Sequence, residues 1–237
     1  MGGNNQIPGM PAPEIPFPGT QTPTISIPGM QVPSQSPYYI SAQMNFIFRA
    51  RMLWRDLATW LRDYMVSLYG GIGNVEAVSD RLYAIPMDYG NMLRLTFGDQ
   101  VAEQYINLLV QYIALFQSLF TALKNNDVNS INNFTQQIYQ NVEDRAAFLA
   151  SINPFWSRSE WVSLTTAITS MHIEQARTFL TQEYEQNLAI YDRILALANI
   201  IGDYFSQGLI SYFVLSQPQP VQPQQAAQPQ QTFSSYF

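Results

Sequence analysis

The sequence predicts an all-α protein, an antiparallel (up-and-down) bundle of about six helices with a disordered, proline-rich arm at each end. The first observation is the position of charge, since all but one of the Asp, Glu, Lys and Arg residues lie between Arg49 and Asp203. The second is the position of proline, since 13 of the 15 prolines lie in residues 1–40 and 216–237. The third is a helical spacing of apolar residues through the middle. Together they divide the chain into an arm over 1–40, a helical bundle over 41–215 and a tail over 216–237.

Four long stretches of the body repeat apolar residues at alternating spacings of three and four, which places them on one face of a helix. These stretches are Phe46–Tyr64, Tyr105–Leu123, Ile131–Leu149 and Tyr184–Tyr212. Further helices are expected near 75–84, 87–96 and 157–182, with Pro86 dividing the first two because proline breaks a helix interior. No stretch sustains the alternation of a strand, and the short turns predict antiparallel neighbours.

Local signals mark the expected helix ends. The glycine-rich run 70–73 ends the first helix, and Asn74 and Asp127 are expected N-caps. Ser157 and Glu160 fit a capping box, in which each side chain pairs with the other residue's backbone N–H. We expect the core to be built on eight aromatic residues: Trp54, Trp60, Tyr112, Phe116, Trp156, Trp161, Tyr191 and Phe205.

The two arms share a high proline content and carry between them a single charged side chain, that of Glu14. The N-terminal arm repeats Ile-Pro units, as at Ile7-Pro8-Gly9 and Ile27-Pro28-Gly29, and the tail alternates Gln and Pro. Proline removes a backbone donor and fixes φ, so we expect extended polyproline II pieces rather than helices or interior strands. Two interpretations remain open. The arms are either plain disordered tails, or their Ile, Met, Phe and Tyr side chains mediate self-association or partner docking.

Charge and composition argue against several classes of function. The net charge is −6 and the basic residues are scattered singly, so neither nucleic acid nor an anionic membrane surface is an expected partner. The chain has no cysteine, which excludes disulfides, thiolate metal sites and a cysteine nucleophile. Tyr105–Leu123 and Ile194–Leu215 are long enough to span a bilayer. We expect no insertion, because the first carries its polar residues off the apolar stripe and Asp203 in the second would be costly in lipid.

Few residues could carry chemistry. His172 is the single histidine and Lys124 the single lysine. We interpret His172 as a locally hydrogen-bonded helix residue and Lys124 as part of a polar turn. The sequence has no Glu-x-x-His pair of a di-iron bundle, no phosphate-binding loop and no dinucleotide fingerprint. Paired-carboxylate hydrolysis stays open, although nothing singles out a pair. We therefore assign no catalytic, cofactor-binding or metal-ligating residue, and we expect no cofactor.

Four parts of the body resemble a family of small helical proteins from spore-forming Firmicutes. These parts are Asn74–Asp80, Asn141–Leu149, the run Ile152-Asn153-Pro154-Phe155-Trp156 with Trp161, and the Tyr-x6-Tyr-Asp helix in Tyr184–Asp203. The resemblance covers residues 45–214 and neither arm. It implies a helical, sporulation-linked bacterial protein of unassigned function. Family members often carry an acetylglutamate kinase label, but the sequence lacks the glycine-rich phosphate loops and catalytic lysines of such kinases. The resemblance therefore implies no active-site residues.

These observations predict a non-catalytic structural or assembly protein of a bacterial spore coat or cell surface, which binds protein partners or forms a homo-oligomer. One alternative is a helical adaptor that binds a specific protein partner through a helix face. A candidate for that face is a polar stripe on the last helix. The stripe consists of Asp192, Asn199, Asp203 and Ser206. A further alternative is the kinase-labelled enzyme. No signal peptide is recognisable, so the expected location is the cytoplasm or the spore or cell surface.

Overall fold

The computed structural model describes residues 37–215, with side chains from residue 42 onward, and these residues form six α-helices and no strand. The helices are α1 (Pro37–Gly70), α2 (Val75–Phe97), α3 (Asp99–Lys124), α4 (Val128–Ile152), α5 (Arg158–Leu180) and α6 (Tyr184–Leu215). The predicted all-α bundle is confirmed. Helix α1 begins at Pro37, before the expected boundary at 41, because proline is well tolerated in the first turn of a helix. The rest of both predicted arms lies outside the described residues.

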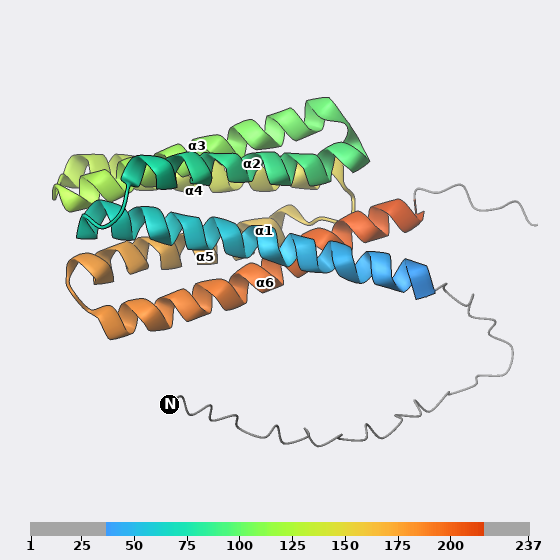
Figure 1. The fold of residues 1–237 in the computed structure, drawn as a ribbon. Helices are drawn as coiled ribbons and strands as arrows, with labels where there is room; N and C mark the ends of the chain where they lie inside the picture. The colour runs from blue at the N-terminus through green and yellow to red at the C-terminus, as the bar shows by residue number, and fades with distance from the viewer. Residues whose placement is uncertain (1–36, 216–237) are drawn as a thin grey trace, which may run out of the picture. The chain divides into compact units, whose positions relative to one another are not determined.

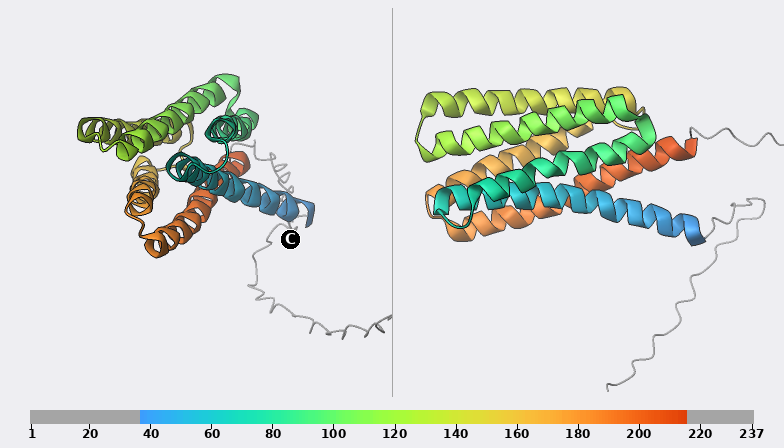
Figure 2. Two further views of the ribbon diagram at one scale, coloured as in Figure 1. Left: turned by 60° about the vertical axis from the view of Figure 1, so that its left-hand side comes forward. Right: turned by 45° about the horizontal axis from the view of Figure 1, so that its top comes forward.

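Each helix packs against the next one in the chain, and α6 packs back on α1, so the helices form a closed ring of neighbours. Helices α1 and α6 cross near their middles (Figure 1), and the crossing is also visible in the right-hand view of Figure 2. The contact is close, since a Cβ added at Gly202 would lie 2.7 Å from Arg51 Cα. Beyond this crossing, the first turns of α1 and the last turns of α6 diverge (Figure 1).

An aromatic cluster fills the interior of the bundle. Trp161 is fully buried and contacts Trp54, Trp156 and Phe205, with ring centroids 6.2, 5.7 and 6.3 Å away. Burial confirms six of the expected core aromatics: Trp54, Tyr112, Phe116, Trp156, Trp161 and Phe205. A large apolar side chain contributes roughly 1.5–3 kcal/mol when it is fully buried, so this cluster is a main source of stability.

Trp60 and Tyr191 are only half-buried, so the prediction that they belong to the core is wrong for Tyr191 and right only in part for Trp60, which packs against the core from its edge. The guanidinium of Arg81 lies over Trp60, with its Cζ 5.1 Å from the ring centroid. Arg62 lies over Tyr191 in the same way, at 4.8 Å. The tyrosine hydroxyl also shares a hydrogen bond of 3.0 Å with the Thr59 hydroxyl. The apolar spacing identified the right helix faces, but arginine side chains cover one face of each of these two rings at the edge of the core.

The expected N-caps form, with one difference. Asn74 and Asp127 each accept a hydrogen bond from the backbone N–H three residues on, at 3.1 Å. Ser157 Oγ accepts from the backbone N–H of Glu160 at 3.4 Å. The reciprocal half of the predicted capping box is absent, because the backbone N–H of Ser157 donates to the Tyr204 hydroxyl at 2.6 Å instead. A contact from α6 has therefore replaced the local bond at the start of α5.

Pro86 does not divide a helix, contrary to the prediction. Helix α2 runs without a break from Val75 to Phe97 with Pro86 inside it. A proline there removes the donor for the carbonyl of Leu82 and costs about 3 kcal/mol. However, Leu82, Ile85, Pro86 and Tyr89 are all buried on the inner face of α2. Packing of this continuous apolar face against the bundle offsets the local cost of the proline.

Candidate functional site

His172 lies inside the bundle on α5, where its side chain is 3% exposed. Its ring meets Phe116 edge-on, with the centroids 5.8 Å apart. Burial lowers the pKa of His172 to about 4, and a hydrogen bond with Gln175 opposes this in part. The imidazole is therefore neutral at pH 7 and shielded from solvent, which is consistent with a structural residue in the core.

Lys124 lies at the exposed end of α3, away from the interior. Its Nζ donates to the backbone carbonyl of Leu68 at 2.7 Å. Leu68 belongs to the last turn of α1, where carbonyls have no partner within the helix, so the lysine caps α1 from a neighbouring helix. Among the residues that the structure describes, His, Asp and Glu form no group of three or more that could hold a metal ion.

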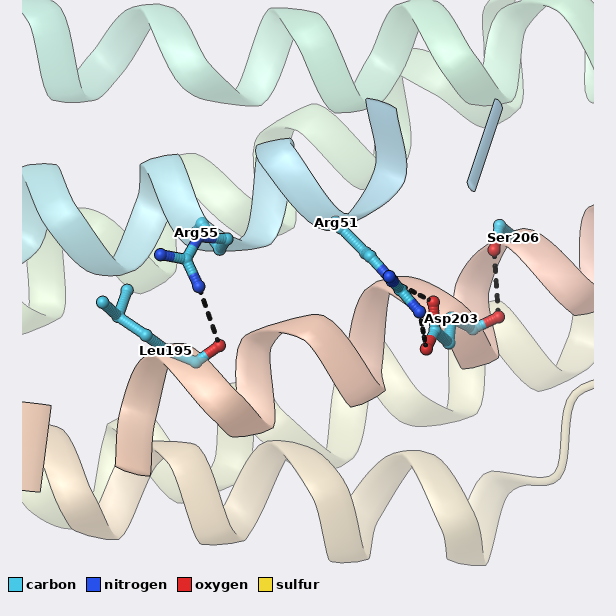
Figure 3. A network of polar contacts seen from close by, with 5 residues as sticks. All are labelled: Arg51, Arg55, Leu195, Asp203 and Ser206. Atoms are coloured by element: carbon cyan, nitrogen blue, oxygen red, sulfur yellow. Dashed lines mark hydrogen bonds and ion pairs between the residues drawn. The ribbon is translucent and has the colours of Figure 1, made fainter. Parts of the chain in front are cut away.

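The predicted polar stripe on α6 is partly covered by α1 (Figure 3). The Arg51 guanidinium pairs with both carboxylate oxygens of Asp203, with Nε–Oδ1 at 2.6 Å and Nη2–Oδ2 at 2.8 Å. These hydrogen bonds and the charge of Asp203 raise the pKa of Arg51. One turn further along α1, Arg55 Nη1 donates to the backbone carbonyl of Leu195 at 3.5 Å. The arginines of α1 thus bind the face of α6 that the stripe occupies.

The interpretation of the stripe as one solvated or partner-facing surface is therefore wrong for two of its members. Asp203 is paired, and Ser206 is buried with its hydroxyl donating to the Asp203 carbonyl at 3.0 Å. Asn199 is half-buried, and only Asp192 is exposed. Sequence spacing placed the four residues on one side of the helix correctly, but it could not show that α1 packs there.

A buried arginine on α4 was not anticipated from the sequence. Arg145 is 2% exposed, and its Nε donates to Asn141 Oδ1 at 2.9 Å. The guanidinium lies over the Tyr112 ring, with Cζ 4.1 Å from the centroid. Within residues 42–215 no carboxylate pairs with Arg145. Arg145 follows Val142 by three residues and precedes Leu149 by four, so it lies on the apolar face of α4. This spacing is the sequence signal that would have indicated its burial.

Three tyrosines surround this arginine and stay protonated at neutral pH. Burial raises the pKa of Tyr89, Tyr105 and Tyr112, and the charge of Arg145 opposes each rise in part. The Tyr112 hydroxyl also shares a hydrogen bond of 2.9 Å with Thr169 of α5. The cluster therefore joins α3, α4 and α5 through fixed polar contacts, and none of its phenols is available as a base at neutral pH.

The surface of the described residues is hollowed between the N-terminal half of α1 and the C-terminal half of α2. The groove has a volume of about 710 Å³. Its apolar lining consists of Phe46, Phe48, Met52, Leu53, Met92 and Leu95. Its polar lining consists of Asn45, Arg49, Asp88 and Asn91. The groove is thus mainly apolar, with one positive and one negative side chain.

Exposed apolar side chains form a row along α1 beside this groove. Met44, Phe48 and Met52 follow one another at a spacing of four and are 49%, 50% and 55% exposed. On α2, Leu95 is 81% exposed. Single exposed apolar residues are common on proteins, but a contiguous apolar patch marks an interaction surface.

From residue 42 to residue 49, the side chains of α1 are at most partly covered by the rest of the bundle. From residue 42 onward, Ala50 is the first buried residue of α1, and Phe46 before it is partly buried against the core. Residues 37–48 also carry no charge. The sequence contained a signal for this segment, because proline becomes rare after Pro37 whereas charge begins only at Arg49. The gap between these two boundaries is an uncharged helical segment, which we call the α1 overhang (residues 37–48).

Helices α3 and α6 have the length and mean hydropathy of membrane-spanning helices. In the bundle, 50% of the apolar window of α3 and 44% of that of α6 are buried. Core helices of a bundle meet the same test of length and composition. In addition, Asp203 of α6 is already paired with Arg51 in this arrangement.

The fold and this surface define a helical bundle with a mainly apolar groove between α1 and α2. Comparison of the chain with family models, with curated proteins and with solved structures gives no match in any of the three. Its function must therefore be inferred from the residues described above.

Proposed function

We propose that this chain is a non-catalytic structural protein that assembles with copies of itself, with the helical bundle as the assembly unit. The observation that carries the proposal is the uncharged α1 overhang beside the apolar groove between α1 and α2. Exposed apolar surface of this kind is costly in water and is removed from water by association. Assembly would remove both the overhang and the groove from solvent.

The chemistry of the groove indicates the kind of partner. Its two charges, Arg49 and Asp88, are of opposite sign, so the groove attracts neither polyanions nor polycations. Its volume is within the range of small-molecule pockets. However, Phe48 and Met52 in its wall are about half exposed, as in the open grooves that bind an amphipathic helix. A protein helix is therefore the better fit.

We propose a spore coat or the cell surface as the place of assembly. The support is the resemblance to helical proteins of spore-forming bacteria and the Gln- and Tyr-bearing composition of the terminal segments, in which Glu14 is the single charged side chain. An adaptor remains the alternative, in which the same groove binds a helix of a different protein. The kinase-labelled enzyme is a further alternative, to which neither His172 nor Lys124 lends support.

Light scattering of the full-length chain over a wide concentration range tests the proposal. A self-assembling protein should give an average mass above the monomer mass of 27.0 kDa, and this mass should rise with concentration. An adaptor without its partner should stay at 27.0 kDa throughout. A constant monomer mass would therefore overturn the proposal of self-assembly.

A further inference from the structure

We infer that the groove between α1 and α2 binds the α1 overhang of a second copy of this chain, in a two-fold symmetric dimer in which Arg49 of each copy faces Asp88 of the other. The inference rests on the proposed function and adds the surface, the partner and the geometry of the contact. Three features of the described residues support it: the row of apolar side chains, the two opposite charges in the groove and the position of the overhang.

The row on α1 has the form that helix packing requires. Side chains four apart, such as Met44, Phe48 and Met52, form a ridge that fits between the ridges of another helix. Two helices that both use such ridges cross at about −50°. In a two-fold interface the same patch serves both copies, so one patch must contain a ridge and a groove. Here they adjoin, because Phe48 and Met52 belong to the ridge and also line the groove.

The two charges of the groove are complementary to each other across such an axis. Arg49 lies on the α1 wall and Asp88 on the α2 wall, and both are exposed. Neither takes part in an ion pair within residues 42–215, whereas nearby Arg51 pairs with Asp203 and Arg94 pairs with acidic residues of α3. A two-fold axis through the groove exchanges its walls, which brings each Arg49 to the Asp88 of the other copy. The dimer thus gains two ion pairs at no cost to an existing one.

A second copy explains the overhang as well as the groove. Residues 42–48 are uncharged and none of them is buried, so their exposed apolar side chains, such as Met44 and Phe48, favour a partner. The two-fold contact removes the overhang and the groove of both copies from water together.

Charge reversal in the full-length chain tests this geometry. Arg49→Asp alone and Asp88→Arg alone each place like charges together twice, so each dimer dissociation constant should rise about tenfold. In an equimolar mixture of the two variants, every contact of the mixed dimer again joins opposite charges. Dimerisation should therefore return in the mixture, measured by sedimentation velocity. Arg193→Asp, at an exposed arginine of α6 outside the groove, is the matched control and should dimerise as the wild type does.

The outcomes separate the inference from the proposed function. If the wild type associates and the reversals leave its dissociation constant unchanged, or if the mixture does not recover, the groove contact is wrong while self-assembly stands. If the wild type is monomeric, both are wrong. A photo-crosslinking phenylalanine analogue at position 48 identifies the occupant directly. Crosslinks to residues 42–53 or 87–95 of a second copy are expected, and crosslinks to residues 1–36 of the same chain would overturn the inference.

Discussion

Protonation of His172 should destabilise the bundle as the pH falls below about 6.5. The side chain is 3% exposed, and burial lowers its pKa to about 4 in the folded chain. In an unfolded chain the pKa of histidine is about 6.5. Between these two values the unfolded state binds a proton and the folded state does not, so stability is present above about pH 6.5 and is lost as the pH falls toward about 4.

The size of the effect follows from the difference between the two pKa values. One pKa unit corresponds to about 1.36 kcal/mol, so the free energy of unfolding should fall by about 3 kcal/mol across this window. The assay is urea unfolding followed by circular dichroism at several pH values from about 7 to about 4. Replacement of the imidazole by an apolar group, His172→Leu, should remove most of this dependence whatever its effect on stability at pH 7.

The contribution of Asp127 is lost at lower pH and can be separated from that of the histidine. Hydrogen bonds from Ser130 lower the pKa of Asp127, so its contribution is lost only as the pH falls through and below the usual carboxylate range, about 4. The reasoning is refuted if wild type and His172→Leu lose the same free energy of unfolding between about pH 6.5 and 4.5. That result would mean that the folded state accommodates the charged imidazole.

Two further predictions concern the crossing of α1 and α6. Gly202→Ala should lower the free energy of unfolding by about 1–3 kcal/mol, because its Cβ would meet backbone atoms of Arg51 at 2.7 and 2.8 Å. Gly70→Ala, whose Cβ would meet only the flexible Ile72 side chain at 3.3 Å, is the control, and equal losses in urea unfolding would contradict the close crossing. A double-mutant cycle of Arg51→Ala and Asp203→Ala should give a coupling of about 0.5–1 kcal/mol, since the two side chains are 39% and 29% exposed. A coupling of zero would show that the pair adds nothing to stability.

Much of the fold could be predicted from the sequence because its signals are local. Asn74 and Asp127 cap helices through hydrogen bonds to the backbone N–H three residues later, and such bonds depend only on the neighbouring sequence. Pro86 was misjudged because burial of the whole α2 face outweighs a local cost. The capping box at Ser157 was half wrong because Tyr204, distant in sequence, takes its backbone donor. These errors have one physical cause, which is tertiary contact overriding local preference.

The candidate site depended on tertiary structure to a greater degree. The groove exists because α1 runs past its crossing with α6 while α2 lies beside it, and no spacing in the sequence reports that crossing. Periodicity showed that Asp203 and Ser206 share a side of α6, but not that Arg51 lies there. A signal for the overhang was present in the uncharged residues before Arg49. From the sequence alone, these residues were divided between the arm and the first helix. Their exposure to solvent could not be predicted.

Sedimentation equilibrium of two full-length variants tests most directly whether the α1 face carries self-assembly. Phe48→Asp and Leu188→Asp each place a carboxylate at an apolar side chain of similar exposure, 50% and 55%, but only Phe48 borders the groove. The proposed dimer buries Phe48 of both copies, so its replacement by aspartate should raise the dimer dissociation constant about 100-fold or more. Phe48→Asp should stay monomeric at concentrations where wild type and Leu188→Asp associate equally. Equal association of all three proteins would contradict it.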